Sequence, residues 1–377
     1  MTPSEERDEA LKLSRGLTAS PANLLRVGRA VGEEAARRAF SQWELRTRAK
    51  TKFGRAEEMF FTREALEQST HEAVAAYHAS LFPAGADVID ITAGIGGDAL
   101  ALAARGPTRA VEMDEERLEC LLRNATALGL AVDAVLGDGA TALEAAENAY
   151  VFADPARRVA GRRTLDLAEF SPDPRRLAEL GKRQRRLVMK LSPMLNDRDL
   201  ESLGACVRFV SFGGECREAL VFAGSDAPTG WEAVHLESGE MLTKPARETA
   251  VQMAEEPGEF LYEVDPAAIR AGLIGEVCAP IKAEPLADSN GYATSNQTCQ
   301  SVWLTGYRVL GSCSSDAKQL KASLSKLGAG KLVLKQRHAG LDLEKMRRQF
   351  ERGTGRPVTL AFYKNRKSIR CALLEAL

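Results

Sequence analysis

Residues 87–98, DVIDITAGIGGD, decide which fold the sequence predicts. The segment begins with β-branched residues, which are typical of a buried strand, and then breaks at Gly94, Gly96 and Gly97. An apolar run over residues 99–104 follows and is typical of a helix. A strand, a glycine turn and a helix N-terminus form the place where an α/β sheet holds a nucleotide-like ligand, because glycine has no Cβ to block the ligand.

The glycine turn alone leaves alternatives open. Gly94, Gly96 and Ala99 also fit the dinucleotide pattern G-x-G-x-x-A, and glycines can gather by chance at an ordinary strand-to-helix turn. The downstream sequence separates these readings, because four consecutive predicted strands carry an acid at or near their C-terminal ends: Asp90, Glu112, Asp138 and Asp154. Glu112 follows Gly94 by 18 residues, where a carboxylate can accept hydrogen bonds from ribose hydroxyls.

This order of strands, glycines and acids resembles the class I S-adenosylmethionine (SAM) methyltransferases. The resemblance implies an α/β fold with a Rossmann-like sheet and SAM as cofactor, with the methionine part at the turn, the ribose at Glu112 and the adenine near Asp138. The residues that it assigns to SAM are Asp90, Ala93, Gly94, Gly96, Gly97, Asp98, Glu112, Met113, Asp138, Gly139 and Asp154. SAM carries a sulfonium cation and no phosphate, whereas Asp90 would face a pyrophosphate unfavourably, so we disfavour NAD.

Residues 1–80 read as helix throughout, and one of these helices, after residue 59, directly precedes the first strand. A helix at this place often covers the cofactor pocket in the superfamily that the chain resembles. Phe61 and Gln68 are therefore further candidates for SAM contact. The alternative is core packing for Phe61 and a surface amide for Gln68.

The segment Asp154-Pro155-Ala156-Arg157 follows the fourth strand. Nucleic-acid amino-methyltransferases commonly carry Asp or Asn, two prolines and an aromatic residue there, and the resemblance implies Asp154, Pro155 and Arg157 as catalytic residues. The second proline and the aromatic are replaced here, so the acceptor atom is left open. Arg157 can stack its guanidinium plane on a base or bind phosphate, or else pair with surface acids as Arg158 can.

Uracil C5 methylation needs a thiolate near the site, and residues 192–194 after the fifth strand contain no cysteine. We therefore disfavour that route, and the resemblance implies a base nitrogen of structured RNA, tRNA or rRNA as the methyl acceptor.

The C-terminal part resembles the THUMP-like domain of bacterial proteins that couple it to a class I methyltransferase. We expect a helical domain at 1–80, the methyltransferase domain at 81–240, a ferredoxin-like segment at 241–300 and the THUMP-like domain at 301–377. True THUMP domains bind RNA, so the resemblance implies RNA capture by this region. The resemblance also implies that an α+β region follows the sheet domain.

Charge is segregated along a chain of net charge -1. Residues 329–370 hold 12 Lys or Arg and three acids, and residues 151–190 hold 11 and five. Such a distribution is expected of a protein with an anionic polymer as ligand, although solvated helix faces are the alternative. The candidate RNA-binding residues are Arg157, Arg158, Lys190, Lys331, Lys335, Arg337, Lys364 and Arg366.

The sequence predicts a SAM-dependent RNA methyltransferase. A small-molecule methyltransferase and a SAM-binding RNA-associated factor without turnover remain alternatives. Seven cysteines are scattered without a C-x-x-C pair and four histidines lack ligand spacing, so we expect reduced thiols and no metal. The polar N-terminus and the lack of a long apolar run favour a cytoplasmic protein without a membrane segment.

Overall fold

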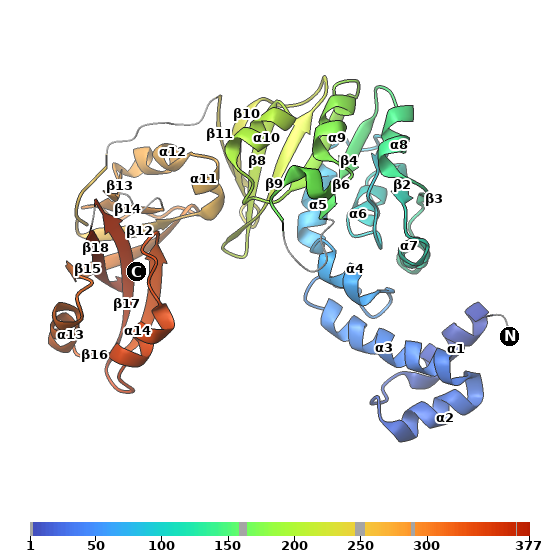
Figure 1. The fold of residues 1–377 in the computed structure, drawn as a ribbon, viewed down its shortest axis with the longest axis horizontal. Coiled ribbons are helices and arrows are strands. Elements are labelled where there is room, and N and C mark those ends of the chain that lie inside the picture. Colours follow the sequence, from blue (N-terminus) through green and yellow to red (C-terminus); the bar gives the residue numbers. More distant parts are fainter. Residues whose placement is uncertain (1–2, 158–163, 246–252, 288–290, 367) are drawn as a thin grey trace. The chain divides into compact units, whose positions relative to one another are not determined.

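We describe a computed structural model of the chain, except for residues 1–2, 158–163, 246–252, 288–290 and 367 (Figure 1). The chain forms two compact units. The first comprises Met1–Lys190 and Phe222–Ala227, and the second comprises Leu191–Val221 and Pro228–Leu377. Among the described residues, no helix combines the length and the hydropathy that a membrane span requires.

The first unit begins with helices, as the sequence predicts. These are α1 (Pro3–Ser14), α2 (Pro21–Val31), α3 (Glu33–Ala49), α4 (Arg63–Gln68) and α5 (Glu72–Ser80). Helices α1, α2 and α3 pack on one another around Leu11, Val27 and Phe40. The side chain of Ser20 caps α2 by accepting a hydrogen bond from the backbone N–H of Asn23.

A parallel sheet follows in the first unit. Its strands are β1 (Val88–Asp90), β2 (Thr108–Glu112), β3 (Asp133–Leu136), β4 (Tyr150–Ala153) and β7 (Arg186–Leu191), in the order β7-β4-β1-β2-β3. The order reverses between β1 and β4, which is where an open α/β sheet forms its ligand crevice. The connecting helices are α6 (Ala99–Ala103), α7 (Glu115–Leu128), α8 (Gly139–Ala145) and α9 (Pro174–Gly181).

Two short strands between β4 and α9 pair antiparallel with each other, β5 (Ala156–Arg157) and β6 (Phe170–Ser171). The 3-10 helix η1 (Leu167–Glu169) directly precedes β6.

The second unit begins with further sheet strands. Helix α10 (Asp197–Leu203) precedes β8 (Cys206–Phe212), β9 (Glu215–Ala223), β10 (Gly230–His235) and β11 (Glu240–Lys244). Strand β10 is parallel to β8 and antiparallel to β11.

The other sheet of the second unit has the order β13-β14-β12-β15-β18-β17-β16. Its strands are β12 (Phe260–Val264), β13 (Glu284–Pro285), β14 (Tyr292–Ser295), β15 (Leu304–Ser314), β16 (Ala329–Arg337), β17 (Arg356–Asn365) and β18 (Ser368–Ala376). The helical elements are α11 (Pro266–Arg270), α12 (Ile274–Cys278), η2 (Ala279–Ile281), α13 (Ala317–Lys326) and α14 (Leu343–Phe350). The segments that we assigned to 241–300 and 301–377 therefore share one sheet.

Strand β14 lies in the polar stretch 289–301, whose composition predicts a loop, so the structure corrects that prediction. The sequence Tyr-Ala-Thr-Ser shows no apolar alternation, yet all four residues are buried between β12 and β13. The Thr294 hydroxyl donates to the carbonyl of Phe260 and accepts from the N–H of Gly258, at 2.7 Å in both cases. Polar residues can fill a buried strand when the backbone satisfies them in this way.

Candidate cofactor and active site

The glycine turn after β1 is held to the next strand by a carboxylate. Gly94 and Gly96 adopt left-handed φ values of 56° and 96°, which side chains other than glycine rarely adopt. The N–H of Gly94 donates to Oε2 of Glu112 at 2.7 Å, and the N–H of Asp114 donates to Oε1 of the same carboxylate at 2.9 Å. Both carboxylate oxygens are thereby fixed at the end of β2.

Backbone segments approach closely at the end of β3 as well. A Cβ on Gly139 would lie 2.0 Å from the carbonyl oxygen of Ile91, so only glycine fits there. Oδ1 of Asp138 caps α8 by accepting from the Thr141 N–H at 2.8 Å. These hydrogen bonds hold the pKa of Asp138 below its ordinary value, so its carboxylate remains an acceptor at neutral pH.

Two apolar side chains stay exposed beside these acids. Met113 is 69% exposed after β2, and Leu136 is 57% exposed at the end of β3. Large apolar groups left in water at a ligand crevice suit the faces of a flat ring such as adenine. Sequence reasoning missed Leu136; its signal was an apolar residue directly before the Gly-Asp pair.

Asp90 lies under the turn with 1% exposure. Burial raises its pKa to about 8, and the nearby carboxylates of Asp98, Asp154 and Glu112 act in the same direction, while the Thr92 N–H opposes them. Without a nearby cation, Asp90 therefore keeps its proton at neutral pH. A sulfonium cation fits this environment, because it would stabilise the ionised carboxylates.

A chain of polar contacts runs from the end of β4 into the core. The carboxylate of Asp154 pairs with the ammonium of Lys190 on β7, which also donates to the Thr70 hydroxyl at 3.1 Å. That hydroxyl donates to Asp98 at 2.7 Å, and the other oxygen of Asp98 lies 2.7 Å from Nδ1 of the fully buried His78. Burial pushes the pKa of Asp98 upward, but these partners outweigh it and leave the pKa below its usual value.

Comparison with known proteins identifies a matching domain family and a solved structure of the same fold. The THUMP domain-like family matches residues 304–375. The structure of a putative methyltransferase from Porphyromonas gingivalis superposes with a TM-score of 0.81 at 21% identity, over 100% of this chain and 99% of that one, and so shows the same fold.

In both Mycobacterium tuberculosis strains compared, a protein named as an uncharacterized S-adenosylmethionine-dependent methyltransferase is 30% identical over 329 residues. The match spans 84% of this chain and 89% of the relative. The chain belongs to the SAM-dependent methyltransferases. Its cofactor is S-adenosylmethionine, as the glycine turn and the acidic strand ends predict.

The methyltransferase places several predicted residues differently from the expectation. Phe61 is 1% exposed and packs on Phe53 in the core with ring centroids 5.8 Å apart, so it offers no surface to a ligand. Gln68 is exposed and donates to Glu64 at 3.0 Å. Asp98 directs both carboxylate oxygens at Thr70 and His78, which makes it a support of the turn.

The remaining predicted residues of the first unit lie near the turn or β4. Ala93 is buried and its N–H donates to the carbonyl of Val111 at 3.1 Å, and a Cβ on Gly97 would lie 3.4 Å from the N of Thr70. Pro155 is buried. The side chain of Arg157 and all of Arg158 lie outside the described residues.

The polar chain also contains residues that the sequence did not reveal. Thr70 and His78 come from the segment before β1, and no motif marks them. Lys52, after α3, donates to the carbonyls of Leu66, Glu67 and Ser69 at 2.7 to 3.1 Å. Burial lowers the pKa of Lys52 and the nearby charge of Lys190 lowers it further, so two ammonium groups lie close together here.

Most of the candidate cations on β16 and β17 have acidic partners. Lys335 pairs with Glu263, Arg337 approaches the same carboxylate at 3.9 Å, and Arg366 pairs with Glu255. Lys331 and Lys364 are exposed, and neither makes an ion pair within the part of the chain that the structure describes. No cluster of His, Cys, Asp and Glu among the described residues has the make-up of a metal site.

Proposed function

We propose that this methyltransferase transfers the methyl group of SAM to an amino nitrogen of a base in structured RNA, tRNA or rRNA. The observation that supports it most is the position of Asp154, whose carboxylate stands at the end of β4 beside the acidic crevice and is held by Lys190. The match to the THUMP domain-like family supports RNA as the substrate.

In this proposal the residues around the turn hold the cofactor. Glu112 accepts the ribose hydroxyls, Asp138 accepts from the adenine amino group, and Met113 and Leu136 cover the ring. Bound SAM supplies a methyl group on a positively charged sulfur. Asp90, ionised in its presence, faces that charge.

Asp154 acts on the acceptor. Its carboxylate accepts an N–H of the exocyclic amine and so directs the nitrogen lone pair toward the methyl carbon. Lys190 fixes the carboxylate, and the donation from the Asp154 N–H to the Thr92 hydroxyl at 2.6 Å fixes its backbone. When the nitrogen gains the methyl group, the proton that it loses can pass to Asp154 and then to water.

The test is methyl transfer from labelled SAM to total RNA from a strain that lacks the gene, followed by mass spectrometry of the nucleosides. We expect one methylated nucleoside, modified on an exocyclic nitrogen. A label confined to small molecules, or a methyl group on carbon, would contradict the proposal.

A small-molecule methyltransferase is the second candidate. The observation in its favour is the pairing of Lys335, Arg337 and Arg366 with Glu263 and Glu255, which reduces the positive charge that the second unit offers to phosphates. Protein purified without bound nucleic acid and inactive on RNA would favour this candidate.

A further inference from the structure

A groove of about 950 Å³ opens among the helices of the first unit. It is lined from α1, α3 and the segment after α3 by Asp8, Leu11, Lys12, Arg15, Trp43, Arg46, Lys50, Phe53, Gly54, Arg55, Glu57 and Glu58. Five of these residues are cationic and three are acidic, so the lining carries a formal excess of two positive charges. The arrangement of the cations decides what the groove can bind.

Arg46 lies in this lining with 6% exposure. Its Nε donates to the carbonyl of Met59 at 2.8 Å, and its guanidinium carbon lies 4.7 Å from the centroid of the Trp43 ring and 4.9 Å from that of Phe60. Within the described residues, no carboxylate lies in ion-pair distance of Arg46. The aromatic faces offset only part of the free energy of burying a charge.

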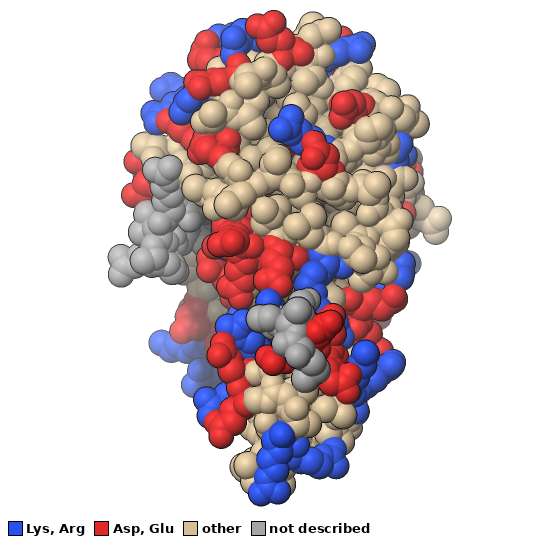
Figure 2. Space-filling view, turned by 90° about the vertical axis from the view of Figure 1, so that its right-hand side faces the viewer, with Lys and Arg blue, Asp and Glu red and all other residues tan. Residues whose placement is uncertain are grey.

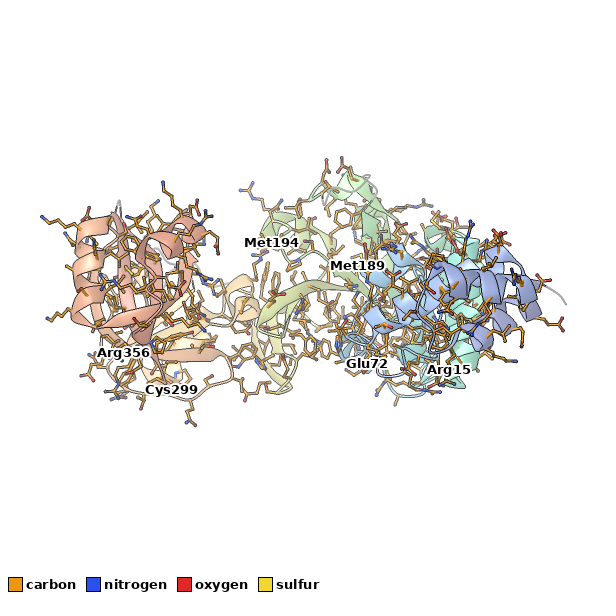
Figure 3. All side chains as sticks on the ribbon, turned by 90° about the horizontal axis from the view of Figure 1, so that it is seen from below. Arg15, Glu72, Met189, Met194, Cys299 and Arg356 are labelled. Carbon is orange, nitrogen blue, oxygen red and sulfur yellow. The ribbon has the colours of Figure 1, made fainter. Side chains whose placement is uncertain are left out.

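Neighbouring cations raise the free energy of burying the charge of Arg46. Burial is the main cause that lowers the pKa of Arg46 to about 10, and the positive charges of Arg123 and Arg15 lower it further, against an opposite effect of Glu57. Arg15, labelled in Figure 3, is exposed, and among the described residues it has no ion-pair partner. Glu57 attracts both Arg15 and Arg46, but it is itself paired with Lys50, so the two guanidinium groups share one carboxylate that already has a partner.

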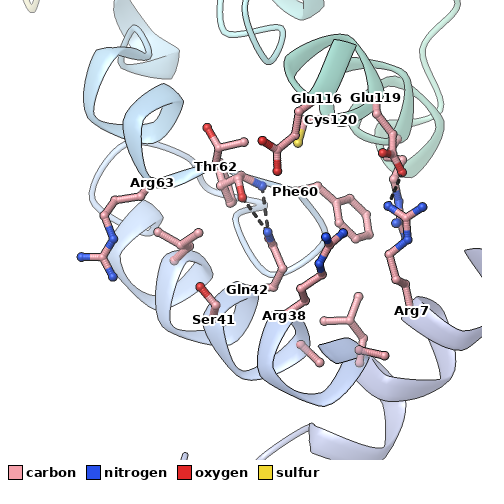
Figure 4. A pocket seen from close by; sticks show the side chains of 16 residues that line it. Arg7, Arg38, Ser41, Gln42, Phe60, Thr62, Arg63, Glu116, Glu119 and Cys120 are labelled. Atoms are coloured by element: carbon pink, nitrogen blue, oxygen red, sulfur yellow. Dashed lines mark hydrogen bonds and ion pairs between the residues drawn. The ribbon is translucent and has the colours of Figure 1, made fainter. Parts of the chain in front are cut away.

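The neighbouring pocket of about 300 Å³ shows the opposite pattern (Figure 4). Each of its four arginines has an acidic partner: Arg7 with Glu119, Arg38 with Glu34, Arg63 with Glu44 and Arg123 with Asp8. The face of the molecule displayed in Figure 2 also has basic and acidic groups side by side over most of its charged area. In the pocket every arginine is compensated, whereas in the groove Arg15 and Arg46 are in no ion pair among the described residues.

Two further cations of the groove can leave their surface ion pairs and bind a phosphate instead. Lys50 pairs with Glu57 and Arg55 with Glu58, each at 2.6 Å between exposed side chains. Such surface pairs contribute ~0–1 kcal/mol and exchange easily for a phosphate partner.

We infer that this groove binds phosphate groups of the RNA substrate, with Arg15 and Arg46 as the main contacts. The inference rests on the proposed function for the identity of the polymer. The phosphate chemistry rests on these two guanidiniums, which are in no ion pair among the described residues, because an anion would supply the negative charge that Glu57 shares with Lys50. The groove is larger than one phosphate group needs, and its lining includes the half-buried Trp43.

The test measures the affinity of the full chain for a single-stranded RNA oligonucleotide as a function of salt. Arg15→Glu should weaken binding at least tenfold and lower the slope of log affinity against log salt by ~0.7, the value for one phosphate contact. Arg26→Gln is the matched control, because Arg26 is an exposed cation of α2 outside the groove, and it should leave both quantities unchanged. SAM affinity should be unchanged in both variants, which shows that they are folded.

A second variant, Arg46→Lys, keeps the charge and removes the planar fork, and it should also weaken RNA binding. If Arg15→Glu binds and methylates RNA as the unmodified protein does, the groove inference is wrong and the proposed function stands. If the unmodified protein binds no RNA, the RNA occupant and the proposed function both fail. Inorganic pyrophosphate at matched ionic strength then identifies a phosphate site if it raises the melting temperature of the unmodified protein but not of Arg15→Glu.

Discussion

The basic C-terminal segment and the helical groove both combine paired and unpaired cations, although the sequence makes only the first look basic. Residues 329–370 contain 12 cations, and among the described ones Lys335, Arg337, Arg356, Arg366 and Arg370 pair with glutamates outside that segment. Residues 1–80 contain 13 cations and 12 acids and look neutral, yet the groove leaves Arg15 and Arg46 without carboxylate partners among the described residues. The difference teaches that a charge count along the chain does not measure the charge available to a ligand.

The largest expected effect distinguishes a loss of the methyl-transfer step from a loss of RNA binding by either region. Asp154→Ala should lower the rate of methyl transfer by ~10²–10⁴-fold, the range for a lost general acid–base group. RNA affinity should change by less than about threefold, since Asp154 lies outside the C-terminal strands and the groove, and most SAM binding should remain. Rates from single-turnover transfer of labelled methyl groups check this.

The control for that variant is Asp133→Ala, which removes an exposed acid paired with Arg109 at 3.7 Å on the β3 edge. It should transfer methyl groups at the normal rate. A near-normal rate for Asp154→Ala would remove this residue from the chemistry.

The second effect concerns the cofactor. Gly96→Val should abolish SAM binding measured by calorimetry, because a Cβ there would lie 3.0 Å from Leu100 and the φ of 96° is strained for valine. RNA affinity should persist if capture depends on the basic regions alone. Gly353→Val, at a glycine with open space around its Cβ, is the control, and equal SAM affinity in both variants would contradict the turn as the cofactor site.

The third effect is a dependence of stability on pH through Asp90. The pKa of Asp90 in the folded protein is about 8, above its ordinary value of 3.8, so the folded state binds the proton more tightly than the unfolded state. Stability without SAM should therefore fall as the pH rises between these two values, by ~1.4 kcal/mol for each unit of the difference at most. Asp90→Asn should flatten the dependence of melting temperature on pH.

SAM should act against that trend, because its sulfonium favours ionised Asp90. The shift in melting temperature that SAM produces should grow from pH 6 to pH 8 in the unmodified protein, with an effect of a few degrees. A constant shift across this range would show that Asp90 does not interact with the sulfonium.

The smallest effect tests the C-terminal cations. Replacing both Lys331 and Lys364 by Gln should lower the salt slope of RNA binding by up to ~1.4, since each phosphate contact to a single strand contributes ~0.7. Lys335→Gln should leave the slope unchanged and destabilise the second unit, because Glu263 then loses its nearer cationic partner and keeps only Arg337, at 3.9 Å. The reverse pattern would mean that RNA displaces Glu263 and that pairing does not neutralise these cations.

Point variants are preferable to deletion of residues 329–377. Strands β16, β17 and β18 share a sheet and a core with β12 and β15, so a deletion would expose apolar residues such as Leu261 and Leu320. Any loss of RNA binding would then report on unfolding.

The sequence predicted the glycine turn and the acidic strand ends well, because strand ends at one edge of a parallel sheet must lie together. It did not predict the partners of the site residues. Asp98 bonds to Thr70 and His78, and Lys190 to Asp154, and these contacts depend on how α5 and β7 pack. Strand β14 and Leu136 were missed for a related reason, since buried polar residues and exposed apolar ones carry no periodic signal.

Strand β18 is synthesised after β15, β16 and β17 but lies between β15 and β17 in the sheet. During translation, the facing edges of β15 and β17 therefore have no partner until residues 368–376 leave the ribosome. Unpaired strand edges are sites of aggregation, and chains of this size expose them for seconds at ~5–20 residues per second. The nascent second unit thus depends on shielding of these edges. A ribosome that stalls before residue 368 would leave β15 and β17 without the strand that joins them in the sheet.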